Sequence, residues 1–336
     1  MSSCRTCPVE PEEVPGRLRV VLEEALAGRP TALLAGRVQQ LIEAYRSGEV
    51  PAAVILDDPA TVSAYAAYRM PATVAALRSA LGELYDAVPD LAVEHLVDLG
   101  GGTGATGWAV ASLDGGLARV DVLEQAAPAR AAGADLARRS GIPALVESRW
   151  HPWTLGSSRV PAGTGDADLA VVSYVLGELP EPLRPEAVEV AASLASTVLV
   201  IEPGTPAGHD RVLAARERLL ALGLRVAAPC PHGSACPLAE GDWCHFPARV
   251  ERSALHRSIK GGELSYEDEK FSYVAATRLP VQAGSGRVLR HPLLRKGLVG
   301  LPLCLPDGTT AERVVSRRQG AGYKQARRTG WGDALR

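Results

Sequence analysis

Hydrophobic residues recur every three to four positions through much of the first 90 residues. Leu, Val and Ala gather on one face of each of four segments, which predicts helices over Glu12–Ala27, Thr31–Ser47, Ala60–Tyr68 and Thr73–Ala87. Residues 1–10 lack this period, and we expect them to form a flexible tail. The pattern therefore predicts an N-terminal helical region over residues 11–90.

From His95 onward, short apolar runs alternate with amphipathic segments. The runs predict strands over His95–Leu99, Arg119–Glu124, Ala144–Val146, Ala167–Ser173 and Thr197–Glu202. The segments between and after them predict helices over Ala105–Ser112, Ala126–Ser140, Pro182–Ala195 and His209–Ala221. This alternation is typical of an α/β fold with a parallel, doubly wound sheet. We expect residues 91–225 to form that domain.

The pattern changes again after Leu224, where Pro, Gly and Cys are frequent. Short β-like runs follow at Ser272–Arg278, Arg287–Arg290, Leu298–Cys304 and Glu312–Ser316, with an Asp307-Gly308 turn before the last of them. The basic run Arg317–Arg328 is compatible with a helix. We therefore predict a small β-rich region over residues 226–336.

The composition fits a folded chain with a sizeable core, because 46% of its 336 residues are hydrophobic. No apolar run reaches the roughly 20 residues that span a bilayer, and the N-terminus does not resemble a signal peptide. We expect no membrane partner and a cytoplasmic location.

The charge is divided unevenly along the chain. Residues 249–336 carry 17 basic and 8 acidic side chains, whereas the whole chain has a net charge of −2. A basic region of this kind is typical of a surface that contacts nucleic-acid phosphates. Nearly all of the basic residues are arginines, and the codon bias of a GC-rich genome would also explain that preference.

A glycine-rich turn follows the first predicted strand of the α/β region. The sequence runs from Leu96 to Gly107 and contains Gly102-x-Gly104-x-x-Gly107, a dinucleotide-type pattern that is weak evidence by itself. Asp98 lies inside the strand and Glu124 ends the next one, where a carboxylate can accept hydrogen bonds from ribose. These two acids favour S-adenosylmethionine over NAD, although an empty, vestigial site remains an alternative. The expected binding residues are Asp98, Gly100, Gly101, Gly102, Gly104 and Glu124.

The sequence contains no motif that identifies the methyl acceptor. The end of the fourth predicted strand, Val172–Leu179, lacks the Asn/Asp-Pro-Pro-aromatic turn that many amino-group methyltransferases use. No cysteine nucleophile lies near residues 173–178 or 202–206. Whether the protein is an enzyme therefore stays open, and no catalytic residue is assigned.

Four cysteines form a second candidate site. Cys230, Cys236 and Cys244 fall within 15 residues, and Cys304 lies far downstream. Their spacing differs from the paired C-x2-C motifs of common zinc folds, and two of them precede proline, as is frequent around iron–sulfur clusters. We favour a 4Fe-4S cluster. Zinc with help from His232 or His245, or merely buried cysteines, are the alternatives. The separate Cys4-x-x-Cys7 pair looks incidental.

Several of these residues resemble one known family. The resembling segments are Tyr65-x-x-Tyr68-Arg69-x-Pro71-Ala72-Thr73, Glu202-Pro203-Gly204-Thr205-Pro206, Pro229-Cys230-Pro231-His232, Cys236-Pro237-Leu238, Asp242-Trp243-Cys244-His245-Phe246, Arg249-Val250-x-Arg252, His256-Arg257, Tyr266–Tyr273 and Ala326-Arg327-x-x-x-Trp331-Gly332-Asp333. Together they resemble the Rsm-twenty-two family, also called methyltransferase-like protein seventeen, and the chain looks like a bacterial-type member.

The resemblance implies a class I methyltransferase-like fold with a cluster held by Cys230, Cys236, Cys244 and Cys304. It also implies that the protein is an assembly or translation factor on the small ribosomal subunit and its rRNA, and we expect a monomer when it is off the ribosome. An active S-adenosylmethionine-dependent rRNA methyltransferase is the first alternative. An iron- or redox-sensing regulator of ribosome assembly is the second.

Overall fold

The computed structural model describes residues 9–47, 58–252, 265–282 and 284–335. Most of the predicted tail, with Cys4 and Cys7, lies outside these ranges, as do His256 and Arg257. The first described elements are the 3-10 turn η1 (Pro11–Glu13) and the helices α1 (Val14–Leu26) and α2 (Thr31–Ser47). The three elements confirm the helical character predicted for this region.

The long helix α4 (Pro59–Ala87) joins two segments that were predicted as separate helices. The side chain of Asp58 caps its start by accepting a 2.8 Å hydrogen bond from the backbone of Thr61. Pro71 lies inside the helix and removes one backbone hydrogen bond, which costs about 3 kcal/mol. The helix continues because its next residues, from Ala72 to Val74, are buried.

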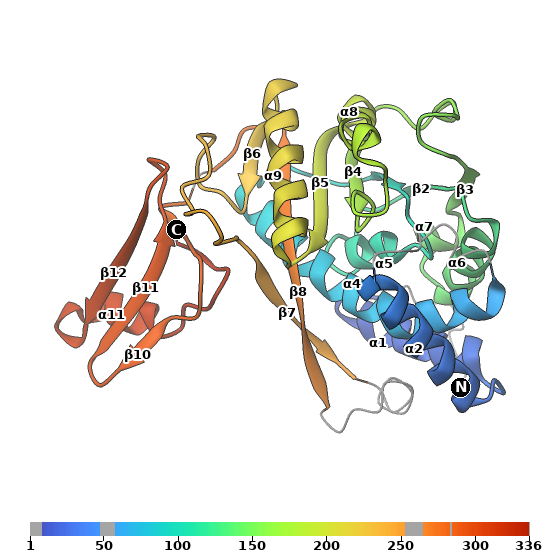
Figure 1. Ribbon diagram of the computed structural model, residues 1–336, viewed down its shortest axis with the longest axis horizontal. Coiled ribbons are helices and arrows are strands. Elements are labelled where there is room, and N and C mark those ends of the chain that lie inside the picture. Colours follow the sequence, from blue (N-terminus) through green and yellow to red (C-terminus); the bar gives the residue numbers. More distant parts are fainter. Residues whose placement is uncertain (1–8, 48–57, 253–264, 283, 336) are drawn as a thin grey trace, which may run out of the picture.

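The main sheet is mixed and mostly parallel (Figure 1). Its strands lie in the order β3-β2-β1-β4-β5-β8-β6, and β7 pairs with β8. The bounds are β1 His95–Leu99, β2 Arg119–Glu124, β3 Arg149–Pro152, β4 Ala167–Ser173, β5 Ala195–Pro203, β6 Arg225–Ala228, β7 Phe246–Glu251 and β8 Tyr266–Thr277. Strands β1 to β5 are parallel, and β8 runs antiparallel to β5. The predicted α/β, doubly wound sheet is confirmed.

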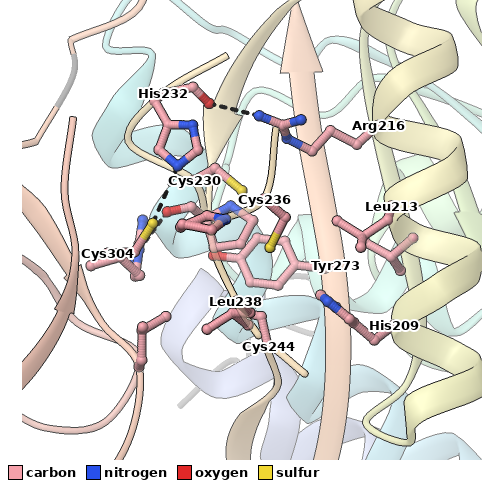
Figure 2. A pocket seen from close by; sticks show the side chains of 15 residues that line it. His209, Leu213, Arg216, Cys230, His232, Cys236, Leu238, Cys244, Tyr273 and Cys304 are labelled. Atoms are coloured by element: carbon pink, nitrogen blue, oxygen red, sulfur yellow. Dashed lines mark hydrogen bonds between the residues drawn. The ribbon is translucent and has the colours of Figure 1, made fainter. Parts of the chain in front are cut away.

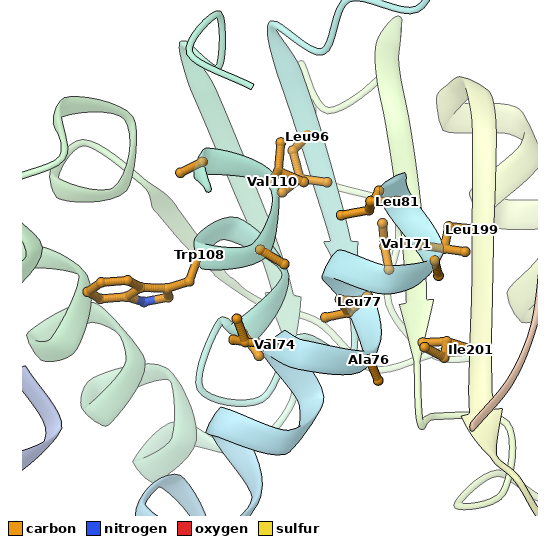
Figure 3. Close-up of a cluster of buried hydrophobic side chains, with 14 of the residues drawn as sticks. Val74, Ala76, Leu77, Leu81, Leu96, Trp108, Val110, Val171, Leu199 and Ile201 are labelled. Atoms are coloured by element: carbon orange, nitrogen blue, oxygen red, sulfur yellow. The ribbon is translucent and has the colours of Figure 1, made fainter. Parts of the chain in front are cut away.

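Helices cover both faces of this sheet. The bounds are α5 Ala105–Ala111, α6 Ala127–Ser140, α7 Pro143–Val146, α8 Arg184–Leu194 after the 3-10 turn η2 (Glu181–Leu183), and α9 Pro206–Ala221. Alternate residues of each strand enter two separate cores: Leu199 packs with α4 and α5, whereas Val198 and Val200 pack with α8 and α9. Figure 3 shows Leu77 and Leu81 of α4 against the first face.

One predicted strand is wrong. Ala144–Val146 belongs to the short helix α7, and β3 follows it at Arg149–Pro152. Pro143 occupies the first helical position, where its missing N–H costs nothing, and a run of three apolar residues cannot distinguish a helix from a strand. The sequence pattern missed β3 because its four residues are half-buried or exposed and therefore form no apolar run.

The region after residue 225 divides between two sheets. Strands β6, β7 and β8 belong to the main sheet, while a second, five-stranded sheet has the order β10-β11-β9-β13 with β12 beside β11. Its bounds are β9 Gly286–Val288, β10 Leu293–Arg295, β11 Leu298–Cys304, β12 Thr310–Ser316 and β13 Ala334–Leu335. The basic run forms the 3-10 turn η3 (Arg317–Gln319) and the short helix α11 (Ala321–Ala326), which packs on this sheet.

Candidate functional site

The glycine turn connects β1 to α5 in a conformation that side chains would obstruct. Gly100, Gly102 and Gly104 have φ angles of +65°, +54° and +81°, in the left-handed region that favours glycine. A Cβ on Gly101 would lie 2.5 Å from Oδ2 of Asp98. The turn is therefore held close to the carboxylate that precedes it.

Asp98 of β1 is buried beside this turn, and neither carboxylate oxygen has a well-formed hydrogen bond among the described residues, although the Thr106 side chain interacts with it favourably. Only 1% of its surface is exposed, and it lines a cavity together with Ser173, whose hydroxyl also lacks a partner. Burial raises the pKa of Asp98 to about 7. An unsatisfied acid of this kind is costly unless a ligand or water completes its bonds.

Glu124 has a different environment. Its Oε2 accepts a 2.9 Å hydrogen bond from the backbone N–H of Gly102, and its Oε1 accepts one of 2.7 Å from Ala126. The carboxylate thus braces the glycine turn. Each oxygen retains a second lone pair, so the predicted contact with ribose hydroxyls stays a prediction.

Helix α4 closes the cavity beside Asp98. Tyr65, Met70 and Thr73 line it, and the Thr103 hydroxyl lies 3.7 Å from Sδ of Met70. The remaining space is about 30 Å³, far below the roughly 300 Å³ or more of typical ligand pockets. The sequence did not predict this cover, because an apolar helix face indicates core packing without indicating what it covers.

The edge beyond Ser173, where a methyl acceptor would lie, is also occupied by side chains of the protein. Tyr174 has a φ of +59°, and its hydroxyl donates a 3.2 Å hydrogen bond to Glu269 on β8. Arg69 of α4 donates two hydrogen bonds to the same carboxylate, at 3.0 and 3.3 Å. This network ties α4, β4 and β8 together across the site.

The four predicted cysteine ligands line one pocket, together with Tyr273 of β8 (Figure 2). Cys230, Cys236 and Cys244 come from the loop between β6 and β7, and Cys304 ends β11. All four are free thiols. Burial and the neighbouring thiols raise the pKa of Cys304 to about 12 and also raise that of Cys230.

Two buried arginines flank these thiols. Arg216 of α9 is 3% exposed and donates a 3.0 Å hydrogen bond to the carbonyl of His232 (Figure 2). It donates a second one, of 2.6 Å, to the carbonyl of Ser234. No acidic side chain pairs with it among the described residues, and its Nε lacks an acceptor. Arg287 donates to the carbonyl of Pro229 and pairs with Glu83.

The positive charge of Arg216 indicates what the pocket can hold. A buried cation without a counter-anion is costly, and Arg216 interacts with the Cys230 thiol in the sense that favours its negative form. As they stand, however, no three His, Cys, Asp or Glu side chains in the described ranges are arranged to hold a metal ion. Sequence patterns missed Arg216, because an arginine on an amphipathic helix is normally solvent-facing.

None of the helices in the described part of the chain is long and apolar enough to cross a membrane. Comparison with solved structures finds the plantazolicin methyltransferase BpumL in complex with SAH, with 11% identity and a TM-score of 0.40 over 71% of this chain and 98% of that one. A precorrin-6y methyltransferase from Geobacter metallireducens matches with 14% identity and a TM-score of 0.36, over 58% and 85%.

Two relatives are similar in sequence. The human ribosome assembly protein METTL17, mitochondrial, is 28% identical over 98% of this chain and 75% of its own length. Rsm22-cox11 tandem protein 2, mitochondrial, of Schizosaccharomyces pombe is 25% identical over 83% of this chain, which spans 43% of that protein. Both names place those relatives in mitochondria, so the cytoplasmic location stays a prediction. The model of the family Mitochondrial small ribosomal subunit Rsm22 matches residues 59–336, and the chain belongs to that family.

Proposed function

We propose that the protein is an assembly or translation factor that binds the rRNA of the small ribosomal subunit. Family membership carries this proposal, and the 17 basic against 8 acidic side chains of residues 249–336 support it. A relative of similar sequence is itself named a ribosome assembly protein. We further expect a cytoplasmic monomer when the protein is off the ribosome.

S-adenosylmethionine is the proposed ligand of the glycine turn. The unpaired, buried carboxylate of Asp98 suits the ammonium group of its amino acid end, which would satisfy both the charge and the hydrogen bonds. The closed cavity requires the part of α4 around Tyr65 and Met70 to move before such a ligand enters. When bound, the ligand supplies an electrophilic methyl group.

An assembly role fits this site better than methyl transfer does. The ion pair of Arg69 and Glu269, with Tyr174 bonded to it, occupies the edge where an acceptor would have to approach. An active rRNA methyltransferase is the alternative. Transfer of a tritiated methyl group to isolated small subunits, measured where S-adenosylmethionine binding is detected, separates the two: labelled rRNA would refute the non-catalytic proposal.

A 4Fe-4S cluster is the proposed occupant of the cysteine pocket, held by Cys230, Cys236, Cys244 and Cys304. Four thiols without a required histidine match such a cluster, and its negative charge with four thiolates would balance Arg216. A cluster of several irons also takes thiols that are farther apart than a single zinc ion does, which is why zinc is the less favoured alternative. The cluster would fix the loop between β6 and β7.

The whole proposal is tested by anaerobic purification of the full chain. We expect iron and acid-labile sulfide, an absorbance band near 400 nm, and copurified small-subunit rRNA. If the protein instead contains zinc and no acid-labile sulfide, the pocket is a zinc site and the cluster assignment is wrong. Absence of small-subunit rRNA, both in the preparation and in binding assays with purified subunits, would refute the assembly role. Dependence of RNA binding on iron loading would favour the iron-sensing alternative.

A further inference from the structure

A stripe of aromatic rings lies beside the cysteine pocket. We define the ring stripe as Trp243, His245, Trp331 and His291 together with Lys270. Trp243 stacks on His245 with ring centroids 5.2 Å apart, and His245 meets Trp331 edge-on at 4.9 Å. The rings of His291 and Trp331 also meet edge-on, with centroids 4.8 Å apart, and Nζ of Lys270 lies 4.2 Å from the centre of the Trp331 ring.

The stripe is assembled from four segments that are distant in sequence. Trp243 and His245 precede β7, Lys270 belongs to β8, His291 lies between β9 and β10, and Trp331 precedes β13. Trp243 is anchored by a 3.0 Å hydrogen bond from its Nε1 to the carbonyl of Gly204, just beyond β5. The stripe therefore runs from the carboxyl edge of the main sheet to the second sheet.

Its members are unusual for this chain. Aromatic residues make up only 4% of the sequence, yet two of its five tryptophans gather here. None of the stripe residues is fully buried: His291 is exposed and the other four are half-buried. A purely structural cluster would bury its rings, as Phe271 and Tyr273 do next to it.

Rings that reach solvent beside cations match the chemistry of unpaired nucleotides. Each base offers a flat face that stacks on an aromatic side chain, and the backbone phosphates pair with Lys and Arg. Arg290 adds a second cation: it donates a 3.0 Å hydrogen bond to the carbonyl of Trp243 and pairs with Asp242. Acidic peptides would use the cations but would leave the rings without a matching partner.

We infer that the ring stripe is a stacking platform for a single-stranded segment of RNA. The inference rests on the proposed rRNA-binding function, and it assigns the contact with unpaired bases to the ring stripe. Because Cys244 stands between Trp243 and His245 in the chain, filling the cysteine pocket would hold two of the rings in place.

The test compares three probes on the anaerobically purified full chain: a 12-nucleotide single-stranded oligoribonucleotide, an abasic strand of the same length, and an RNA duplex. We expect the single strand to bind most tightly and to quench tryptophan fluorescence. Loss of stacking should weaken the abasic strand by about 5-fold or more. Equal binding of the abasic strand would overturn the inference, since phosphate contacts alone would then explain affinity.

Two variants and a control extend the test. His291→Ala should weaken binding of the single strand about 5-fold or more without changing binding of the abasic strand. Lys270→Gln should remove one phosphate contact from both the intact and the abasic strand. The slope of log binding constant against log salt concentration should then become shallower by about 0.7 for each strand. Leu294→Ala, at a position 58% exposed on the neighbouring strand β10, should change neither. Unchanged affinity of His291→Ala, in a protein with the wild-type melting temperature, would also overturn the inference.

The two proposals fail in distinguishable ways. If the wild-type protein binds small-subunit rRNA but does not discriminate intact from abasic strands, only the stacking platform is wrong. If it binds no RNA at all, the proposed assembly role is wrong as well.

Discussion

Nε2 of His232 lies 3.3 Å from Sγ of Cys304, although 72 residues separate them in the chain. Cys304 ends β11 of the second sheet, whereas His232 belongs to the loop that follows β6 of the main sheet. This contact and the shared pocket place Cys304 beside the three cysteines of that loop. The pocket thus lies at the junction of the two sheets, and its occupancy should affect both.

We predict that Cys304→Ser removes most of the bound metal. With three thiols left, the site loses both a ligand and a negative charge near Arg216, so iron and sulfide per chain should fall by more than half. Cys7→Ser is the matched control, because the Cys4–Cys7 pair is expected to be incidental, and it should leave the metal content unchanged. Full iron and sulfide in Cys304→Ser would remove Cys304 from the ligand set.

Arg216 should be needed to retain the metal. Arg216→Met deletes the buried cation and two hydrogen bonds that hold the carbonyls of His232 and Ser234. We expect loss of metal to a chelator to become about 10-fold faster, as for other residues that support metal ligands. The control is Arg218→Met on the same helix, since Arg218 is 42% exposed and pairs with Glu189. Equal rates for both variants would contradict the role of Arg216.

Asp98 should make the ligand-free protein less stable as the pH rises. Its pKa is about 7 in the folded protein and about 3.9 in an unfolded chain. Between these values the folded state keeps a proton that the unfolded state releases, so the free energy of unfolding falls with increasing pH, by roughly 4 kcal/mol in total.

The variant Asp98→Asn removes this dependence. It should melt at a higher temperature than the wild type at pH 8, and the difference should shrink toward pH 4. Asp135→Asn serves as the control, because the pKa of Asp135 is lowered by Arg139 and Arg138 on the surface of α6. Thermal unfolding followed by circular dichroism at several pH values measures the effect. A pH-independent difference would mean that Asp98 is ionised throughout.

The parts of this protein that depend on local pattern were predictable. The apolar runs of β1, β2 and β4 were predicted correctly, because each is a short hydrophobic run in the sequence. The glycine turn after Leu99 was predictable because its backbone conformation requires glycine. The predicted strand over Leu298–Cys304 matches β11, and Asp307-Gly308 leads into β12 as expected. The family resemblance, carried by the cysteine loop, is confirmed by the match over residues 59–336.

The parts that depend on tertiary placement were not predictable. Nothing in the period of Tyr266–Thr277 shows that β8 inserts between β5 and β6 of the main sheet. Nothing in α4 shows that Tyr65 and Met70 close the cavity beside Asp98, and nothing in α9 shows that Arg216 points at the thiols. These are contacts between distant segments, and a single sequence carries no local signal for them.

The fit of α6 against the glycine turn gives a last prediction, one that needs no ligand. A Cβ on Gly133 of α6 would lie 2.2 Å from the ring of Trp150 and 3.0 Å from the backbone of Thr103. The ring cannot easily retreat, because its Nε1 donates a 2.9 Å hydrogen bond to the hydroxyl of Ser148. We expect Gly133→Ala to lower the free energy of unfolding by about 1–3 kcal/mol, despite the better helix propensity of alanine.

Gly82→Ala in α4 is the matched control. It makes the same chemical change inside a helix, but apart from the adjoining backbone of the helix no atom lies within 4 Å of the added Cβ. There the free energy of unfolding should rise by about 0.5–1 kcal/mol. Urea denaturation of both variants compares them directly. If Gly133→Ala is stabilised as much as Gly82→Ala, Trp150 has room to move, and the glycine turn is packed less tightly than the contacts of Gly133 indicate.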